Sequence, residues 1–224
     1  EIIMHKGLLF DLDGVLVDTA KYHFLAWKQL ADELGIPFTA QDNERFKGVS
    51  RAHCMEILLD LGGQTMPEEK QIFYQDKKNQ TYVAYIQNMG QEEVLPGVTE
   101  FLRDAKNRGY AIALGSASKN SGLILDRLHL TQYFDAIVDG TKVSRAKPDP
   151  EVFLQGAVEL GLPPQECVVF EDAVAGVQAA HAGGMQAVGI GSRQVLPEAD
   201  FNLPGFQNIT IVNIEAGLTK WAHL

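Results

Sequence analysis

Leu8-Leu9-Phe10-Asp11-Leu12-Asp13-Gly14-Val15 places a continuous apolar run directly before two carboxylates and a glycine. Short apolar runs of this kind are typical of strands in a parallel sheet, because helices cover both faces of such a sheet. Asp11 and Asp13 are two residues apart, so in extended backbone their side chains point toward the same side. There they could serve one substrate as a nucleophile and a proton-handling group.

The same Asp-x-Asp-Gly pattern also occurs in calcium-binding loops and in ordinary turns. A calcium loop fits poorly, because the third acidic or Asn ligand before the glycine is missing and the twelfth position is Tyr22 instead of Glu. The local sequence therefore leaves a turn and a catalytic site as equally good interpretations.

Similar apolar runs recur along the chain and alternate with helical patterns. The predicted strands are residues 8–10, 111–114, 136–138, 168–170, 187–190 and 209–212. The predicted helices between them are residues 98–107, 121–128, 151–160 and 173–182. Asp149-Pro150 provides an N-cap and a first-turn proline for one of these helices. This alternation predicts an α/β fold, a doubly wound, mostly parallel sheet with a Rossmann-like core.

Residues 18–90 interrupt the alternation, since they show helical periods and no convincing strand. Apolar residues share one face of a first helix at positions Phe24, Trp27, Leu30, Ala31 and Leu34. A second short helix is expected around residues 55–61, and a long third helix from Pro67 to about Asn88. We expect an inserted α-helical cap domain, with residues 1–17 and 91–224 forming the α/β core domain that carries the catalytic site. Both connections lie together and could act as a hinge.

Ligands of open α/β sheets bind at the carboxyl edge, so residues that follow the predicted strands are candidates for a site. The segment Ser116-Ala117-Ser118-Lys119-Asn120 follows one strand and could hold phosphate through hydroxyl and backbone N–H groups. Lys147 could add a point charge, although an isolated lysine before a helix is usually solvated surface. Glu171-Asp172 repeats the pattern of an apolar strand that ends in carboxylates.

A carboxylate nucleophile and a phosphate repel each other, so a reaction between them needs positive charge nearby. Mg²⁺ prefers a few carboxylate and carbonyl oxygens. The donor set predicted from the sequence is Asp11, the backbone carbonyl of Asp13, Glu171 and Asp172.

The ordered set of Asp11-x-Asp13, Ser116, Lys147 and Glu171-Asp172 resembles the four signature motifs of the haloacid dehalogenase superfamily, in its branch with a helical cap. The resemblance implies that Asp11 attacks phosphorus with Mg²⁺ bound, and that Asp13 protonates the leaving oxygen and deprotonates the next nucleophile. Haloalkanoate dehalogenases of this superfamily lack the second carboxylate, so Asp13 favours phosphoryl transfer.

In the expected cap, residues 46–51 offer a basic turn in which Arg51 could clamp a phosphate. Without the core motifs, a solvated loop between helices would be the better interpretation of this segment. Together with Tyr22-His23 and Trp27, it is similar to the β-phosphoglucomutase family. The resemblance implies that Thr19 belongs to the hinge, His23 assists the acid/base step and Arg51 holds the non-reacting phosphate. Without it, His23 and Trp27 would be interpreted as packing residues. The substrate and phosphate residues implied by the resemblance are Thr19, His23, Trp27, Lys47, Gly48, Val49, Ser50, Arg51, Lys78, Ser116, Ala117, Ser118, Lys119, Asn120 and Lys147.

The reaction implied is the interconversion of β-D-glucose 1-phosphate and glucose 6-phosphate through an aspartyl-phosphate and a bisphosphate intermediate. A mutase must exclude water while the intermediate turns around, which demands closure of the cap. A sugar-phosphate phosphatase of the same superfamily is the alternative enzyme. A non-catalytic phosphosugar-binding protein is a third hypothesis, which the retained carboxylates disfavour.

Bulk properties exclude several other classes. The net charge of −10 disfavours nucleic acid as a partner, and no apolar run is long enough to cross a membrane. Cys54 and Cys167 are too few for a disulfide scaffold, and a cytoplasmic monomer is expected. Gly189-Ile190-Gly191 lacks the third glycine of a dinucleotide fingerprint, so a nicotinamide cofactor is not expected.

Overall fold

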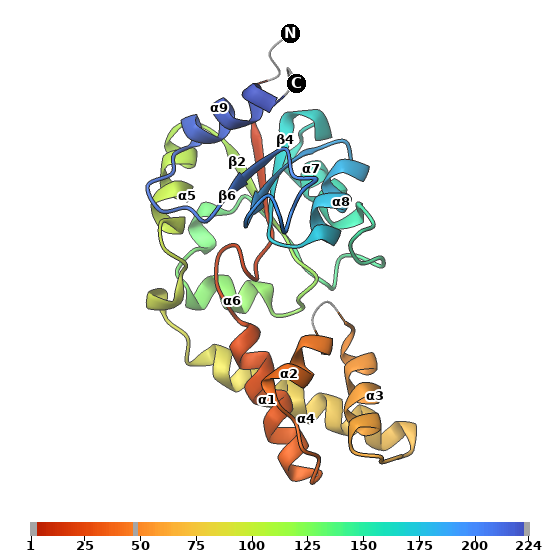
Figure 1. The fold of residues 1–224 in the computed structure, drawn as a ribbon. Coiled ribbons are helices and arrows are strands. Elements are labelled where there is room, and N and C mark those ends of the chain that lie inside the picture. Colours follow the sequence, from red (N-terminus) through yellow and green to blue (C-terminus); the bar gives the residue numbers. More distant parts are fainter. Residues whose placement is uncertain (1–3, 47–48, 222–224) are drawn as a thin grey trace. The chain divides into compact units, whose positions relative to one another are not determined.

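The computed structural model describes residues 4–46 and 49–221 and contains one sheet of parallel strands (Figure 1). The strands are β1 (Gly7–Phe10), β2 (Ala111–Gly115), β3 (Ala136–Val138), β4 (Cys167–Glu171), β5 (Gln186–Ile190) and β6 (Phe201–Leu203). Their order in the sheet is β3-β2-β1-β4-β5-β6, so the strand order reverses beside β1. This order confirms the predicted doubly wound α/β fold, whose ligand-binding edge lies where β1 and its two neighbours end.

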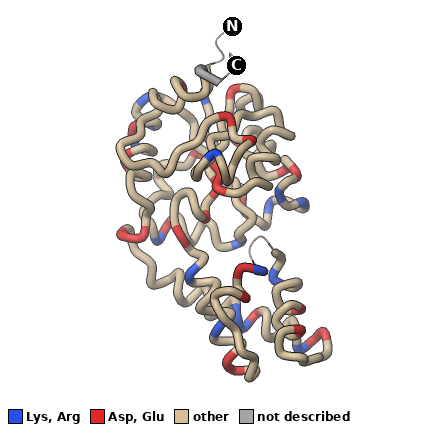
Figure 2. The backbone as a smooth tube through the Cα atoms, in the orientation of Figure 1, with Lys and Arg blue, Asp and Glu red and all other residues tan. Residues whose placement is uncertain are grey.

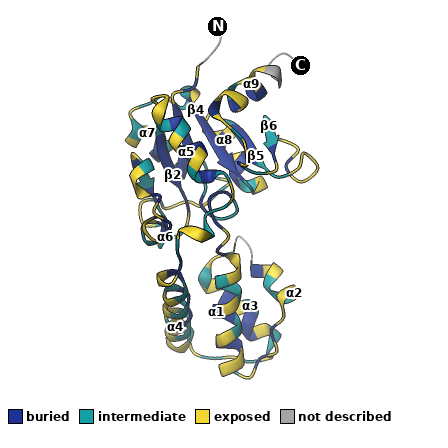
Figure 3. Cartoon of the chain, turned by 90° about the vertical axis from the view of Figure 1, so that its left-hand side faces the viewer, coloured by how far each residue is buried: buried dark blue, intermediate teal, exposed yellow. Residues whose placement is uncertain are grey.

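Helices cover both faces of the sheet (Figure 1). They are α5 (Val98–Asn107), α6 (Ser121–Arg127), α7 (Glu151–Leu160), α8 (Val174–Ala182) and α9 (Ile211–Trp221). Leu9 and Val169 pack with residues of α7 and α8 in one buried cluster. The central strands are buried throughout, whereas the helices expose their outer sides (Figure 3). Short 3₁₀ turns lie at Glu44–Phe46, Gln91–Glu93, Thr131–Tyr133 and Pro164–Glu166.

A stacked aromatic pair fixes the register of the two central strands. Phe10 pairs with Phe170 across β1 and β4, and their rings stack with centroids 4.6 Å apart on the face opposite Leu9. Both rings are completely buried, and Phe101 of α5 meets each of them edge-on. The next residue on each strand is a carboxylate, Asp11 or Glu171. The core packing therefore brings these two carboxylates side by side.

The predicted strand at residues 209–212 is wrong, because Ile211 opens helix α9 instead. Ile211, Ile214 and Leu218 are buried and follow helical spacing, which the short window 209–212 does not reveal. Asn213 Oδ1 accepts hydrogen bonds from the backbone N–H and hydroxyl of Thr210, 2.8 and 3.0 Å away, and so caps the helix. The sixth strand is β6, in which Asn202 separates two apolar residues, so that no continuous apolar run marks it.

A second compact unit comprises residues Thr19–Asn88, and the first comprises the residues before and after it. Its helices are α1 (Ala20–Glu33), α2 (Ala40–Asn43), α3 (Arg51–Leu61) and α4 (Glu68–Gln87). Trp27 and Phe46 meet edge-on inside its apolar core. The short helix α2 was not predicted, although Thr39 and Asp42 form the capping box that begins it. The inserted unit is helical, as the sequence predicts.

Acidic residues outnumber basic ones, 29 to 19, and both signs are spread along both units (Figure 2). Any site for an anion must therefore depend on a local group of cations. Within the ranges that the structure describes, no helix combines the length and the apolar character needed to cross a bilayer.

Candidate active site

Three carboxylates meet at the carboxyl edge of the sheet. Asp11 follows β1, Glu171 ends β4 and Asp172 follows it, and one oxygen from each lies within 4.8 Å of the others. Burial and, after it, the charge of Asp11 raise the pKa of Glu171. Burial and the charges of Asp11 and Glu171 raise the pKa of Asp172 to about 8. This crowding of negative charge fits a hard divalent cation such as Mg²⁺, which binds through carboxylate oxygens.

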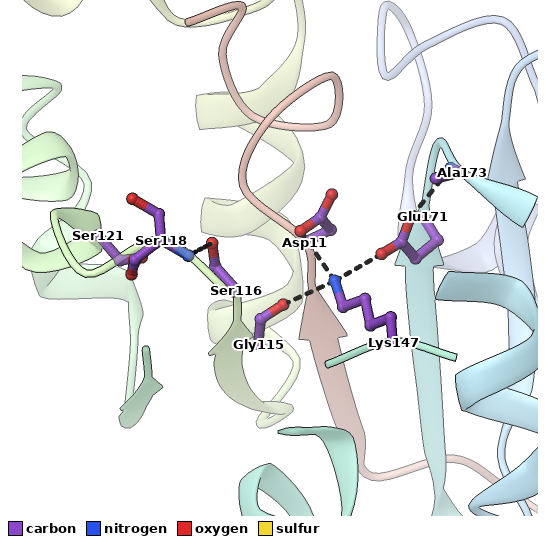
Figure 4. Close-up of polar contacts among 8 residues, drawn as sticks. All are labelled: Asp11, Gly115, Ser116, Ser118, Ser121, Lys147, Glu171 and Ala173. Atoms are coloured by element: carbon purple, nitrogen blue, oxygen red, sulfur yellow. Dashed lines mark hydrogen bonds and ion pairs between the residues drawn. The ribbon is translucent and has the colours of Figure 1, made fainter. Parts of the chain in front are cut away.

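Lys147 lies within this group (Figure 4). Its Nζ donates hydrogen bonds to Asp11 Oδ1 at 2.9 Å and to Glu171 Oε1 at 2.6 Å. It also donates to the Gly115 carbonyl at 3.1 Å and lies 4.7 Å from the centre of the Phe153 ring. Burial lowers the pKa of Lys147, but the charges of Asp11 and Glu171 outweigh it, so that the net shift is upward. The ammonium is therefore charged at neutral pH, and Lys147 is not the solvated surface residue that its local sequence also allowed.

The glycine after the two aspartates lets Asp172 come close to the first loop. Gly14 has a φ of +75°, and a Cβ at this position would lie 1.9 Å from Asp172 Oδ2. Among the described residues, Asp13 does not belong to the group whose side chains could share one ion. The acid/base role of the Asp13 side chain stays a prediction.

Sequence reasoning missed Gly176 of α8, which makes room for Glu171. A Cβ at Gly176 would lie 1.9 Å from Glu171 Cδ and 2.0 Å from its Oε1. We expect Gly176→Ala to displace the carboxylate and weaken Mg²⁺ binding about 10–100-fold, the usual cost of disturbing residues around a metal site. Isothermal titration calorimetry with Mg²⁺ checks this.

The matched control is Gly122→Ala in helix α6, where the added Cβ meets no atom within 4 Å. Mg²⁺ affinity should not change in this variant. Equal affinities in both variants would show that the position of Glu171 does not matter for the ion.

The segment after β2 carries hydroxyl groups at the same edge of the sheet (Figure 4). Ser116 is buried, and its Oγ accepts a hydrogen bond from the Ser118 amide at 3.1 Å. Ser118 Oγ accepts from the Asn120 amide at 3.2 Å, and Asn120 directly precedes α6. Ala117 and Lys119 are exposed. The predicted phosphate loop is therefore held by its own serines.

The helical unit contains a separate group of cationic side chains. The Lys78 ammonium is 3.0 Å from His23 Nδ1 and lies over the rings of Trp27 and Tyr82 at 4.9 and 5.1 Å. The His23 ring stacks on Tyr82 with centroids 3.9 Å apart. The sequence pointed to Lys78, His23 and Trp27, but it missed Tyr82, which lies one turn after Lys78 on α4.

Arg51 adds a further charge to this group. Its Nη2 donates to Asn79 Oδ1 at 3.0 Å. Burial is the largest cause that lowers the pKa of His23 to about 3, and the charges of Lys78 and Arg51 contribute to this shift. Burial is also the largest cause that lowers the pKa of Lys78 to about 7, followed by the charge of Arg51. In the part of the chain that the structure describes, the side-chain hydrogen-bond partners of Lys78 and Arg51 are the uncharged His23 and Asn79. The group would be stabilised by a bound anion.

The remaining predicted cap residues are less informative. Thr19 is fully buried and directly precedes α1. Ser50 caps α3, because its hydroxyl oxygen accepts a hydrogen bond from the His53 amide at 3.2 Å. Val49 packs against the apolar core of the helical unit. Lys47 and Gly48 lie outside the described residues. Roles of these positions in substrate binding stay predictions.

Fold and site together define an α/β protein in which an aspartate after the first strand shares its site with a lysine and two further carboxylates. Residues 5–184 match the model of the haloacid dehalogenase-like hydrolases, and the chain belongs to this family.

Individual relatives extend this family assignment. The chain is 41% identical to the β-phosphoglucomutase of Bacillus subtilis over 210 residues, which are 92% of each protein. It is 32% identical over 187 residues to a phosphorylated carbohydrates phosphatase of Thermotoga maritima, covering 82% of this chain and 83% of the relative. The crystal structure of β-phosphoglucomutase from Clostridium difficile superimposes with a TM-score of 0.88 and 34% identity, covering 99% of this chain and all of the other. The family resemblance seen in the sequence is thus confirmed.

Proposed function

We propose that this chain is a Mg²⁺-dependent β-phosphoglucomutase, which interconverts β-D-glucose 1-phosphate and glucose 6-phosphate. The observation that carries the proposal is Asp11, held 2.9 Å from the Lys147 ammonium within a group of three carboxylates suited to one divalent cation. The relatives named β-phosphoglucomutase favour the mutase within this family.

In this mechanism Asp11 attacks phosphorus and forms an aspartyl-phosphate, while Asp13 protonates the departing sugar oxygen. Once Asp11 is phosphorylated, Asp13 takes the proton from the 6-hydroxyl of a bound β-glucose 1-phosphate, which accepts the phosphoryl group and becomes β-glucose 1,6-bisphosphate. After this intermediate turns around, its 1-phosphoryl group passes to Asp11, Asp13 protonates the departing 1-oxygen, and glucose 6-phosphate is released. Asp11, Glu171 and Asp172 would hold Mg²⁺ with the Asp13 carbonyl, and the bound ion would neutralise charge at the phosphate. Lys147 and Ser116 would hold the reacting phosphate.

We assign the non-reacting phosphate to the cationic group of the helical unit. Its guanidinium and ammonium groups suit a phosphate dianion, and Arg51 can bind two phosphate oxygens at once. In a chain with net charge −10, such a group without a carboxylate partner in the described ranges points to an anionic ligand. Trp27 and the predicted loop around Lys47 would contact the sugar.

A phosphatase acting on sugar phosphates is the second candidate, supported by the Thermotoga maritima relative. Phosphorus NMR separates the two functions. The protein is incubated with β-glucose 1-phosphate, Mg²⁺ and a trace of the bisphosphate. A mutase gives the glucose 6-phosphate signal, whereas stoichiometric inorganic phosphate without isomerised sugar would establish the phosphatase.

Arg51→Ala should lower mutase turnover about 100-fold, the order of magnitude for losing a bidentate phosphate contact that helps to position the substrate. Hydrolysis of a small phosphate ester should hardly change, since such an ester has no second phosphate. Steady-state rates of both reactions check this. Arg45→Ala, at an exposed arginine of the same unit, is the control and should leave both rates unchanged. Equal losses in both reactions would remove the distal-phosphate role.

A further inference from the structure

The loop that delivers Lys147 to the carboxylates is irregular and largely exposed. It runs from the end of β3 to the start of α7, and Ser144, Arg145 and Ala146 within it are exposed. Exposed loops usually sample several conformations. The ammonium of Lys147 nevertheless makes three hydrogen bonds, to Asp11 and to the buried Gly115 and Glu171, so the loop backbone must be held from elsewhere.

Glu151, the first residue of α7, holds this loop through both of its carboxylate oxygens. Oε1 accepts a hydrogen bond from the Ser144 amide at 3.0 Å, and Oε2 accepts one from the Arg145 amide at 2.8 Å. The Ser144 hydroxyl lies 3.2 and 3.1 Å from the same two oxygens. These hydrogen bonds lower the pKa of Glu151, and the one from the Ser144 amide has the largest effect. The carboxylate therefore stays ionised and binds two consecutive amides of the loop.

The same helix also supports the other end of the Lys147 side chain. Phe153, two residues after Glu151, is completely buried in the core between the sheet and α7, and its ring lies 4.7 Å from Lys147 Nζ. A second hydrogen bond closes the loop, from the Glu151 amide to Asp149 Oδ1 at 3.0 Å. The first turn of α7 thus fixes both the backbone that leads to Lys147 and the surface beneath its ammonium.

We infer that Glu151 is a positioning residue for phosphoryl transfer: by holding the Ser144 and Arg145 amides, it keeps the Lys147 ammonium between Asp11 and Glu171. This inference rests on the proposed function, because it takes Lys147 as a group that holds the reacting phosphate. Loss of the Glu151 carboxylate would leave the residues of the site intact but let the lysine move among several positions. Displacements of about 1 Å at a reacting centre can cost 100-fold in rate.

The test compares Glu151→Ala and Glu151→Gln with the control Glu159→Ala in the intact protein with Mg²⁺. Glu159 lies on the same helix and contacts the same loop through the Lys142 ammonium at 3.1 Å, so it controls for a side-chain ion pair with the loop as distinct from the hydrogen bonds to the Ser144 and Arg145 amides. Three quantities are measured: kcat and KM of phosphoryl transfer, hydrogen exchange of the Ser144 and Arg145 amides, and the free energy of unfolding in urea.

Glu151→Ala should lower kcat about 10–100-fold with little change in KM, and the two amides should exchange faster. Glu151→Gln keeps one acceptor oxygen and should lie between wild type and Glu151→Ala in both respects. The free energy of unfolding should change no more than in Glu159→Ala, whose kcat should equal that of wild type.

Unchanged exchange in Glu151→Ala would overturn the inference, and so would faster exchange with an unchanged kcat. A kcat that falls equally in Glu159→Ala would assign the effect to the helix as a whole. Absence of turnover in the wild type would refute the proposed function, but the exchange measurement would still decide whether Glu151 holds the loop.

Discussion

Asp11→Asn is expected to lower turnover at least about 10⁴-fold, the scale seen when a covalent nucleophile is removed. The amide has nearly the shape of the carboxylate and can still accept the Lys147 hydrogen bond through its oxygen. It has no anionic oxygen to attack phosphorus, so the aspartyl-phosphate cannot form. A coupled assay for glucose 6-phosphate measures the rate, and intact-protein mass spectrometry looks for the added phosphoryl group.

Asp126→Asn provides the control, because Asp126 is exposed on α6 and lies outside the carboxylate group. It should keep the wild-type rate and still gain the phosphoryl group on incubation with substrate. Mass spectrometry also detects any deamidation of the introduced asparagine that would restore the native aspartate. Turnover by a verified Asp11→Asn protein, within tenfold of wild type, would assign the nucleophile elsewhere.

The fold was largely predictable because its signals are local. Continuous apolar runs identified five of the six strands within a residue or two, and proline and glycine marked the ends of helices. The prediction failed at residues 209–212, where a window of four residues cannot separate a strand from the first turn of a helix. The spacing of Ile211, Ile214 and Leu218 extends beyond that window and would have indicated α9.

The core of the candidate site was predictable for a topological reason. Parallel strands end at the same edge, so polar residues after β1, β2 and β4 gather there without further information. The supports of the site could not be predicted in this way. Gly176 lies close to Glu171, and Glu151 contacts the loop before Lys147, through irregular turns that leave no periodic pattern in the sequence.

Lys147→Met should lower kcat about 10³-fold, the upper range for the loss of one preorganised electrostatic contact to a transition state. Methionine has a similar length and can still pack on Phe153, but it removes the only cation that contacts Asp11 and Glu171 among the described residues. The substitution has two effects, and both lower kcat. Asp11 and Glu171 would repel each other more strongly, and the reacting phosphate would lose a positive neighbour.

Mg²⁺ titration of this variant distinguishes those two effects. If repulsion between the carboxylates dominates, saturating Mg²⁺ should restore most of the rate, since the ion would supply the missing charge at the same oxygens. If Lys147 acts mainly on the phosphate, the deficit should persist at saturation. Lys142→Met, at an exposed lysine of the same loop, is the control and should keep the wild-type kcat. A Lys147→Met rate within tenfold of wild type would contradict a role of Lys147 in holding the reacting phosphate. We expect the deficit in kcat to persist at saturating Mg²⁺, because the Lys147 ammonium lies beside the oxygen of the proposed nucleophile, where the phosphate must arrive.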